Sequence, residues 1–463
     1  MRYAWRLLRR QPAYAAVLVA TMALGIAATA VLGSVAYGVL MKPLPWANAP
    51  RLVRLYENRE GSSRRFPPLM TNATYVAWRE APATLDAIGA WSTAQMTLGG
   101  SDRPERFRVA SVTPSLLTLL GAVPAMGRLL VDGDEEPGRA PVLLISRTLW
   151  QQRFGGRPDV LTETLRLNGT TFAIVGVMPP AFEFPDRATR AWAPLHVPPV
   201  TTPGQTGFSL SLFQAIGRLR AGATPAQAAA EGSARGRQAP EHAPVAMAVF
   251  GSTGPVVITA VPILDALTAE VRPAILVLLA AVVLLLATAA ANAASLQLAR
   301  AVARRRELAI RAALGAGRGR LVRQTLVENL LLGLLGGVAG LVLAALMHRA
   351  LPALLPSDFP RVTDVTFGFG IQAFAVAVSM LAGLGCGLLP AWHVARADVV
   401  PALVEDSLAP VGGGLRSQTA RVRALIMAGQ VAIAAILLVG SGLLCRSFYG
   451  MLRADVGYDA TNV

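Results

Sequence analysis

Few side chains in this chain of 463 residues have the type and spacing that catalysis requires. A P-loop needs a lysine after its glycine-rich turn to reach the β and γ phosphates. The chain has one lysine, Lys42, which lies between Met41 and Pro43. The four histidines are scattered, with no HExxH motif and no paired cysteine ligands to complete a zinc site. The sequence therefore predicts no catalytic site, no metal site and no cofactor of its own.

Two acidic features leave alternatives open. The cluster Asp132, Asp134, Glu135 and Glu136 could hold a cation, but its spacing matches no calcium loop, and a solvated turn is the preferred explanation. Glu328 lies one turn inside an apolar run. It could serve a proton relay, or it could pair with Arg323 or a partner at the membrane interface.

The segment 300–325 has the most informative spacing. Arg300, Arg304, Glu307 and Arg311 share one helical face, and Glu307 stands four residues before Arg311, the favourable order for an ion pair. Glycines at 315, 317 and 319 then interrupt the helix before a new amphipathic turn begins. The pattern predicts a helical elbow suited to docking; a topology-setting loop on anionic lipid is the alternative.

The composition places these residues in a membrane protein. Apolar residues make up 53% of the chain and charged ones 15%, against roughly 25% in soluble proteins. A net charge of +16 is compatible with nucleic-acid binding, but residues 41–270 carry 22 basic and 18 acidic side chains, so most of the excess lies beside apolar runs. Charge in that position is typical of topology signals, and it argues against nucleic-acid binding.

Five apolar runs are long enough to cross a bilayer, at 13–40, 271–299, 326–347, 371–395 and 425–445. The first is longer than the core of a signal peptide, so we expect it to be retained. Arginine is concentrated in the segments 1–12, 300–325 and 396–424 and is balanced by acids in the loop 348–370. The positive-inside rule then predicts a cytoplasmic N-terminus, with residues 41–270 and 446–463 outside.

Glycines four residues apart occur in two of these runs. The pairs are Gly333 and Gly337, Gly336 and Gly340, and Gly383 and Gly387. Such spacing lets helices approach closely in lipid, although glycine is also common in membrane helices without that role.

Residues 41–270 have the alternating pattern of a folded α+β domain. Strands are predicted at 106–112 and 141–146, and a hairpin at 164–177, where Asn168 and Gly169 fit a type I′ turn. Helices are expected at 146–154 and 224–236, the second capped by Thr224.

These residues resemble the MacB/FtsX-like ABC transporter permeases. The resemblance is carried by the loop 304–317, by the domain segments 121–128, 141–156 and 167–179, and by the opening motifs at 2–12, 22–26 and 43–45. The opening motifs are similar to the duplicated permeases known as acidobacterial orphan permeases. The segments 420–448 and 456–463 resemble the opening of the second half of such proteins, so we expect four transmembrane helices plus a fifth that begins a second repeat, and a truncated chain.

The resemblance implies a permease of the bacterial inner membrane with a large periplasmic domain of the MacB core type. A separate cytoplasmic ATPase would bind the ATP and drive export or extraction of a hydrophobic or amphipathic substrate. A second permease or a homodimer, and a periplasmic adaptor or outer-membrane channel, are further implied partners. FtsX-like signalling to a periplasmic partner is the alternative function. The implied ATPase-contacting residues are Arg304, Arg305, Arg306, Glu307, Arg311, Gly315, Gly317 and Arg320.

Overall fold

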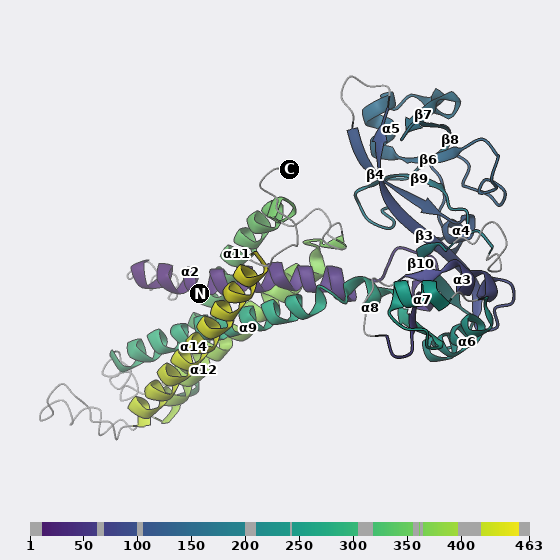
Figure 1. Ribbon diagram of the computed structural model, residues 1–463. Helices are drawn as coiled ribbons and strands as arrows, with labels where there is room; N and C mark the ends of the chain where they lie inside the picture. The colour runs from purple at the N-terminus through teal and green to yellow at the C-terminus, as the bar shows by residue number, and fades with distance from the viewer. Residues whose placement is uncertain are drawn as a thin grey trace, which may run out of the picture. The chain divides into compact units, whose positions relative to one another are not determined.

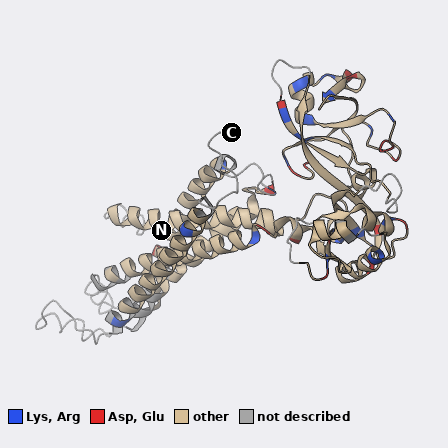
Figure 2. Cartoon of the chain, in the orientation of Figure 1, with Lys and Arg blue, Asp and Glu red and all other residues tan. Residues whose placement is uncertain are grey.

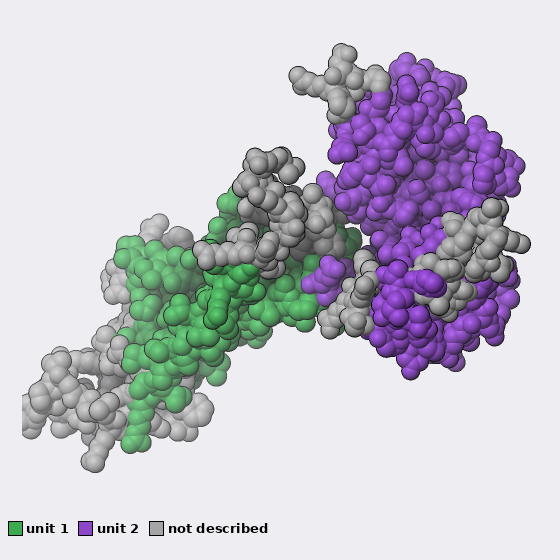
Figure 3. Space-filling view, in the orientation of Figure 1, with its two compact units in different colours: residues 1–41, 271–355, 361–463 green, residues 42–270, 356–360 purple. Residues whose placement is uncertain are grey.

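The computed structural model describes residues 12–62, 69–99, 105–199, 210–240, 243–303, 318–354, 361, 364–396 and 418–452. The chain divides into two compact units (Figure 3). One holds residues 1–41, 271–355 and 361–463, and the other holds residues 42–270 with the short segment 356–360. We call the first unit the helix bundle and the second the α+β domain.

The helix bundle contains long apolar helices at all five predicted runs. They are α2 (Pro12–Ala36) with its π-helical extension η1 (Tyr37–Met41), α9 (Arg272–Ala303), α11 (Arg318–Leu354), α12 (Phe369–Arg396) and α14 (Gln418–Leu452). Figure 2 shows few positions of charged residues along them. Among the described residues, four stretches are long and apolar enough to span a membrane, in α2–η1, α9, α11 and α14. The apolar stretch of α12, Phe369–Gly385, is shorter.

Within the bundle, α11 lies between two neighbours. It packs along α2 on one side and along α12 on another, and α2 also contacts α9 (Figure 1). The shared core contains Met22, Ile26, Leu332, Ala344 and Ala375. Half of the apolar window of α2 is buried in the bundle, whereas none of the α14 window is. The central helix of the unit is therefore α2, and α14 lies outside against α9.

The α+β domain is built on one mixed sheet of eleven strands. Its main order is β11-β1-β10-β3-β4-β9-β6-β8-β5, with β2 on β10 and β7 on β3 and β8. Neighbours are antiparallel except the pairs β4–β9 and β6–β8. The predicted strands at 106–112 and 141–146 are confirmed as β4 and β6. The strands are β1 (Leu52–Arg59), β2 (Met70–Thr71), β3 (Leu85–Leu98), β4 (Glu105–Val112), β5 (Met126–Gly127), β6 (Val142–Ser146), β7 (Thr164–Leu167), β8 (Thr170–Met178), β9 (Thr189–Pro194), β10 (Leu212–Leu219) and β11 (Val256–Pro262).

The predicted hairpin is confirmed between β7 and β8. Asn168 has φ 47° and Gly169 has φ 86°, so both central residues of the turn are in the left-handed region. The Asn168 side chain also accepts a hydrogen bond from the Thr97 amide at 2.8 Å. The turn is therefore fixed both by its own residue types and by β3.

Short helices cover the sheet, and their starts follow capping rules. The predicted cap at Thr224 is confirmed: its hydroxyl accepts from the Gln227 amide while the Gln227 side chain accepts from the Thr224 amide, a capping box. The helix predicted at 146–154 is α5. The helical segments of the domain are η2 (Ala49–Arg51), α3 (Asn72–Arg79), α4 (Pro114–Leu120), α5 (Arg147–Phe154), η3 (Pro158–Thr162), α6 (Pro225–Gln238), α7 (Ala243–Phe250) and α8 (Ile263–Thr268).

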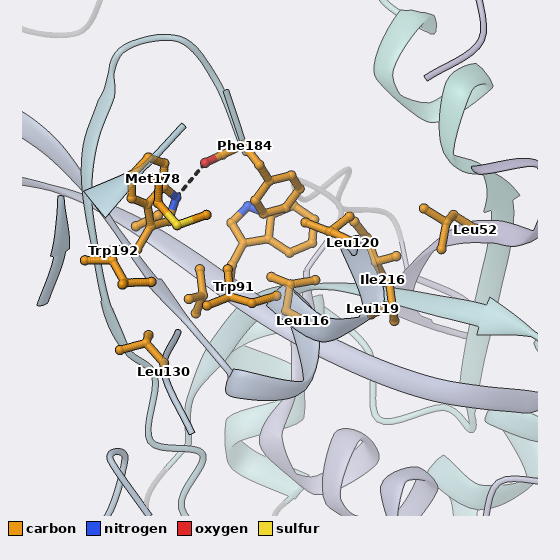
Figure 4. Packing of buried hydrophobic residues seen from close by; sticks show 14 of the residues in the cluster. Leu52, Trp91, Leu116, Leu119, Leu120, Leu130, Met178, Phe184, Trp192 and Ile216 are labelled. Atoms are coloured by element: carbon orange, nitrogen blue, oxygen red, sulfur yellow. Dashed lines mark hydrogen bonds between the residues drawn. The ribbon is translucent and has the colours of Figure 1, made fainter. Parts of the chain in front are cut away.

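An aromatic cluster forms the middle of the domain core (Figure 4). The Trp91 and Phe184 rings meet edge to face at 4.9 Å, and the Trp192 indole N–H donates to the Phe184 carbonyl at 2.7 Å. Gly89 lets α4 lie directly on β3, because a Cβ atom at that position would come within 2.6 Å of the Leu116 Cα. This packing joins the sheet to α4 in one core.

Candidate functional site in the helix bundle

The first glycine stripe of α11 is pressed against α12. A Cβ atom on Gly333 would lie 2.9 Å from the Cα of Gly383 and 3.0 Å from the Ser379 carbonyl oxygen. One on Gly337 would lie 2.8 Å from the Ser379 Cβ. The buried Ser379 hydroxyl donates to the Gly333 carbonyl at 2.6 Å. The two backbones therefore touch, and a polar side chain joins them inside an apolar core.

The second stripe of α11 faces α2 instead. A Cβ atom on Gly336 would come within 2.8 Å of the Met22 Cβ, and one on Gly340 within 3.0 Å of the Ala23 carbonyl and of Ile26. Stripes three residues apart are rotated by about 60° on a helix with 3.6 residues per turn. One helix thus uses two neighbouring glycine faces to hold two partners at once.

The α12 glycines meet α11 at its end nearer residue 318. A Cβ atom on Gly387 would lie 3.0 Å from the Asn329 side chain, and one on Gly383 would lie 3.1 Å from the Asn329 carbonyl. Asn329 is buried, and its neighbour Glu328 is half-buried. The structure therefore places the six glycines predicted for helix packing at two helix contacts, α11–α12 and α11–α2.

The predicted ATPase-contacting residues lie at the start of α11 or before it. Arg304, Arg305, Arg306, Glu307, Arg311, Gly315 and Gly317 fall outside the described residues. Arg320 belongs to the first turn of α11, but its side chain is likewise outside what the structure describes. The predicted elbow is therefore continued, in the described part of the chain, by the helix that contacts both α2 and α12.

Sequence reasoning missed two polar residues of this site, Ser379 and Asn329. Both are polar residues within apolar runs, and each lies four residues from a glycine of a predicted pair: Ser379 precedes Gly383, and Asn329 precedes Gly333. A buried polar group in a membrane helix requires a partner, so this combination was the available signal.

Two carboxylates of the acidic turn in the α+β domain form ion pairs with nearby arginines. Asp134 accepts from Arg128 at 2.6 Å and from the Val131 amide at 3.0 Å, and Glu136 pairs with Arg139. Burial alone would raise the pKa of Asp134, but these hydrogen bonds and the charge of Arg128 leave it below its usual range. Burial raises the pKa of the Glu135 carboxyl, with Arg79 opposing. No group of three or more potential ligands for a metal occurs in the described residues.

This turn gives a pH prediction. Because the folded pKa of Asp134 is depressed, its stabilisation is present above the unfolded value near 3.9 and is lost as the pH falls through the folded value. Asp134→Asn should lower the free energy of unfolding at pH 7 by up to about 1 kcal/mol, since the pair is partly exposed. Thermal unfolding at pH 7 and pH 2 checks this: the difference from the unaltered chain should shrink in acid, and a difference that persists at pH 2 would contradict it.

Comparison with known proteins identifies both parts of the chain. The MacB-like periplasmic core domain matches residues 15–234, and the FtsX-like permease C-terminal domain matches residues 279–399. The macrolide export ATP-binding/permease protein MacB of Agrobacterium fabrum is 38% identical over 103 residues. The pyoverdine export protein PvdT of Pseudomonas syringae pv. syringae is 39% identical over 103 residues. Each match covers 22% of this chain and 15% of the relative's length.

Solved structures are also similar to the chain. The extracellular domain of the transporter YknZ from Gram-positive bacteria aligns with a TM-score of 0.32 at 12% identity, covering 45% of this chain and 99% of that one. The periplasmic region of MacB from Actinobacillus actinomycetemcomitans aligns with a TM-score of 0.34 at 11% identity, covering 51% and 95%.

The expected fold class, a membrane α-helical protein with a large α+β domain, is thus confirmed in the helices, in the mixed sheet and in the matched families. The two family models follow each other along the chain in the order that the resemblance implied, with the periplasmic core first and the permease helices after it. The chain belongs to the MacB/FtsX-like ABC transporter permeases.

Proposed function

We propose that this chain is the permease subunit of an ABC system in which a separate cytoplasmic ATPase drives the α+β domain through the helix bundle. The observation that carries the proposal is the presence, on one chain, of a MacB-like periplasmic core and an FtsX-like permease region. The substrate class is a hydrophobic or amphipathic molecule that is exported or extracted outside the inner membrane. The MacB and PvdT relatives are named as export proteins for macrolides and pyoverdine, which supports export as the direction.

The contacts of α11 support a route for the motion. This helix begins at Arg318, within the segment 300–325 that is predicted to form the elbow, and it packs on both α2 and α12 through its two glycine stripes. The helix α2 runs through η1 to residue 41, where the α+β domain begins, and α9 starts at Arg272, just after that domain ends. A displacement of α11 would therefore reach α2, whose far end connects to the α+β domain.

The proposed topology has the N-terminus in the cytoplasm and the α+β domain in the periplasm. The arginine-rich segments 1–12, 300–325 and 396–424 all lie on the cytoplasmic side in that arrangement, as the positive-inside rule requires. The ATPase would meet the elbow there. A second permease or a second copy of the chain, and a periplasmic adaptor or outer-membrane channel, complete the proposed assembly.

The proposal predicts that the elbow is needed for coupling. Glu307→Ala, and separately Gly315→Pro, should reduce stimulation of the co-purifying ATPase at least about tenfold. The first removes the carboxylate that is predicted to pair with Arg311, and the second replaces a glycine of the predicted helix break with a residue of fixed φ. ATPase activity of the complex in nanodiscs and the amount of ATPase that co-purifies are the measurements.

Two matched variants control for charge and for glycine content. Glu136→Ala removes an exposed acid in the α+β domain, and Gly429→Ala fills open space on α14. Both should bind and stimulate the ATPase as the unaltered chain does. If the elbow variants also did so, the docking assignment would be wrong.

FtsX-like signalling is the second candidate, favoured by the FtsX-like family match. In that case the α+β domain would regulate a periplasmic protein instead of moving a substrate. Purification of the full chain in nanodiscs distinguishes the two: a stable soluble protein partner supports signalling, and ATP-dependent loss of a hydrophobic dye from the membrane supports transport.

A further inference from the structure

The first span changes its geometry just before the α+β domain begins. The helix α2 is regular to Ala36 and continues as the π-helix η1 over Tyr37–Met41. A π-helical turn is wider than an α-helical one, and such turns occur frequently at functional sites. Residue 42, the first of the α+β domain, follows directly. The π-helix η1 is thus the last helical turn of the bundle before the chain enters that domain.

An arginine from the segment before α12 is bonded to this turn. Arg361 Nη1 donates to the Val39 carbonyl at 3.0 Å, and Arg361 Nε donates to Asp364 Oδ2 at 2.8 Å. The Arg361 side chain is only 6% exposed, and that of Asp364 is 22% exposed. A buried guanidinium requires such partners, and one bound to a carboxylate and a carbonyl is fixed in orientation as well as in place.

Beside this bond, the backbone of η1 lies in close contact with the backbone of the segment before α12. A Cβ atom on Gly38 would lie 2.9 Å from both the Asp364 carbonyl oxygen and the Val365 Cα. Arg361 itself has φ 59°, a left-handed conformation that a non-glycine residue adopts only where its surroundings hold it. The Asp364 amide donates to the Arg361 carbonyl at 3.0 Å and closes the turn. The close backbone contact, the left-handed conformation of Arg361 and the hydrogen bonds therefore all fix η1 against the segment before α12.

We propose that Arg361 is a positioning residue that ties the domain-proximal end of α2 to the segment leading into α12. With Asp364 it forms a clamp, which we define as Arg361, Asp364 and the η1 backbone at Gly38 and Val39. The clamp holds η1 in register with the bundle, so that movement of α12 reaches the first residues of the α+β domain. This role in transmission rests on the proposed function, whereas the clamp itself does not.

The proposal is tested by hydrogen–deuterium exchange of the full chain in nanodiscs. In Arg361→Ala, amide exchange in peptides covering 37–46 should accelerate about tenfold or more, because charge-assisted hydrogen bonds to buried groups are lost. Gly38→Ala should have the same local effect without changing any charge, because its Cβ would press on backbone atoms that cannot rotate away. Arg361→Lys should exchange at an intermediate rate, because one ammonium group cannot reproduce the two directed bonds of the guanidinium.

Gly33→Ala is the matched control on the same helix, because its Cβ would make an ordinary contact, 3.6 Å from the Phe374 ring. It should leave exchange at 37–46 unchanged. Peptides from the middle of α11 should also be unchanged in every variant, since a purely structural loss would accelerate exchange throughout the bundle. Unchanged exchange at 37–46 in Arg361→Ala, or equal acceleration across the whole bundle, would overturn the proposal.

A second measurement separates the clamp from the proposed function. Stimulation of the co-purifying ATPase should fall in Arg361→Ala while the amount of bound ATPase stays the same. If exchange at 37–46 accelerates and stimulation is unchanged, the clamp stands and the transmission role is wrong. If the unaltered chain binds no ATPase at all, the proposed function fails while the exchange result still decides the clamp.

Discussion

Replacing Glu57 with alanine is expected to lower the free energy of unfolding of the α+β domain by about 3–5 kcal/mol. The Glu57 side chain is fully buried. It accepts from the Thr71 hydroxyl at 2.8 Å and from the Thr71 amide at 3.2 Å, and it pairs with Arg59 at 3.3 Å. Removing the carboxylate takes a negative charge away from the buried Arg59 guanidinium, to which it is bonded. Chemical denaturation followed by tryptophan fluorescence measures the loss, since Trp78 and Trp91 lie in the adjoining cores.

The matched control is an acid with the same charge and little burial. Glu136 pairs with Arg139, and both side chains are more than half exposed, so Glu136→Ala should cost less than about 1 kcal/mol. The double variant Glu57→Leu with Arg59→Met should recover most of the loss, because both buried charges are then absent. A cost for Glu57→Ala no larger than that of Glu136→Ala would contradict this view of the buried pair.

The position of this carboxylate explains the size of the expected effect. Glu57 lies on β1, while Thr71 is the N-cap residue of α3 and donates to it with two groups. Arg59 extends the network to α7, where its guanidinium lies 5.3 Å from the Phe250 ring centroid. The Glu57 carboxylate therefore connects β1 directly to the start of α3 and, through Arg59, to α7.

Elements whose conformation is determined by residues close in sequence were predictable. The hairpin at Asn168 follows from two residues that tolerate positive φ, and the cap at Thr224 follows from an oxygen placed three residues before a glutamine. The apolar runs fold as helices because a bilayer leaves no other way to satisfy their backbone groups. In each case the determining interactions lie within a few residues, or come from the membrane itself.

Features that depend on distant partners were not predictable in the same way. The spacing of Gly333 and Gly337 predicts close packing but cannot say that their partner is α12 while Gly336 and Gly340 face α2. The bond from Arg361 to Val39 joins residues 322 positions apart. The burial of Glu57 did leave a signal, since it shares one buried face of β1 with Val53 and Leu55 at a period of two.

The two-sided packing of α11 leads to the second large effect. Gly333→Ala should lower the free energy of unfolding of the helix bundle by about 1–3 kcal/mol, the range for overpacking a tight core. Its Cβ would meet the Gly383 Cα at 2.9 Å and the Ser379 carbonyl at 3.0 Å, and neither is a side chain that can rotate away. The helices must separate, and the hydrogen bond from Ser379 to the Gly333 carbonyl is strained with them. Unfolding of the full chain in mixed micelles with increasing dodecyl sulfate measures the loss.

Gly385→Ala on α12 is the matched control, because a Cβ there would meet nothing within 4 Å. It should leave stability unchanged or raise it by up to about 1 kcal/mol, since alanine favours helix over glycine. Equal effects of the two substitutions would mean that helix propensity, and not the α11–α12 contact, decides the outcome. A selective loss in Gly333→Ala would show that α11 and α12 are held together at the backbone. In the proposed function, this contact passes a displacement of α11 to α12 and, through the Arg361 clamp, to the start of the α+β domain.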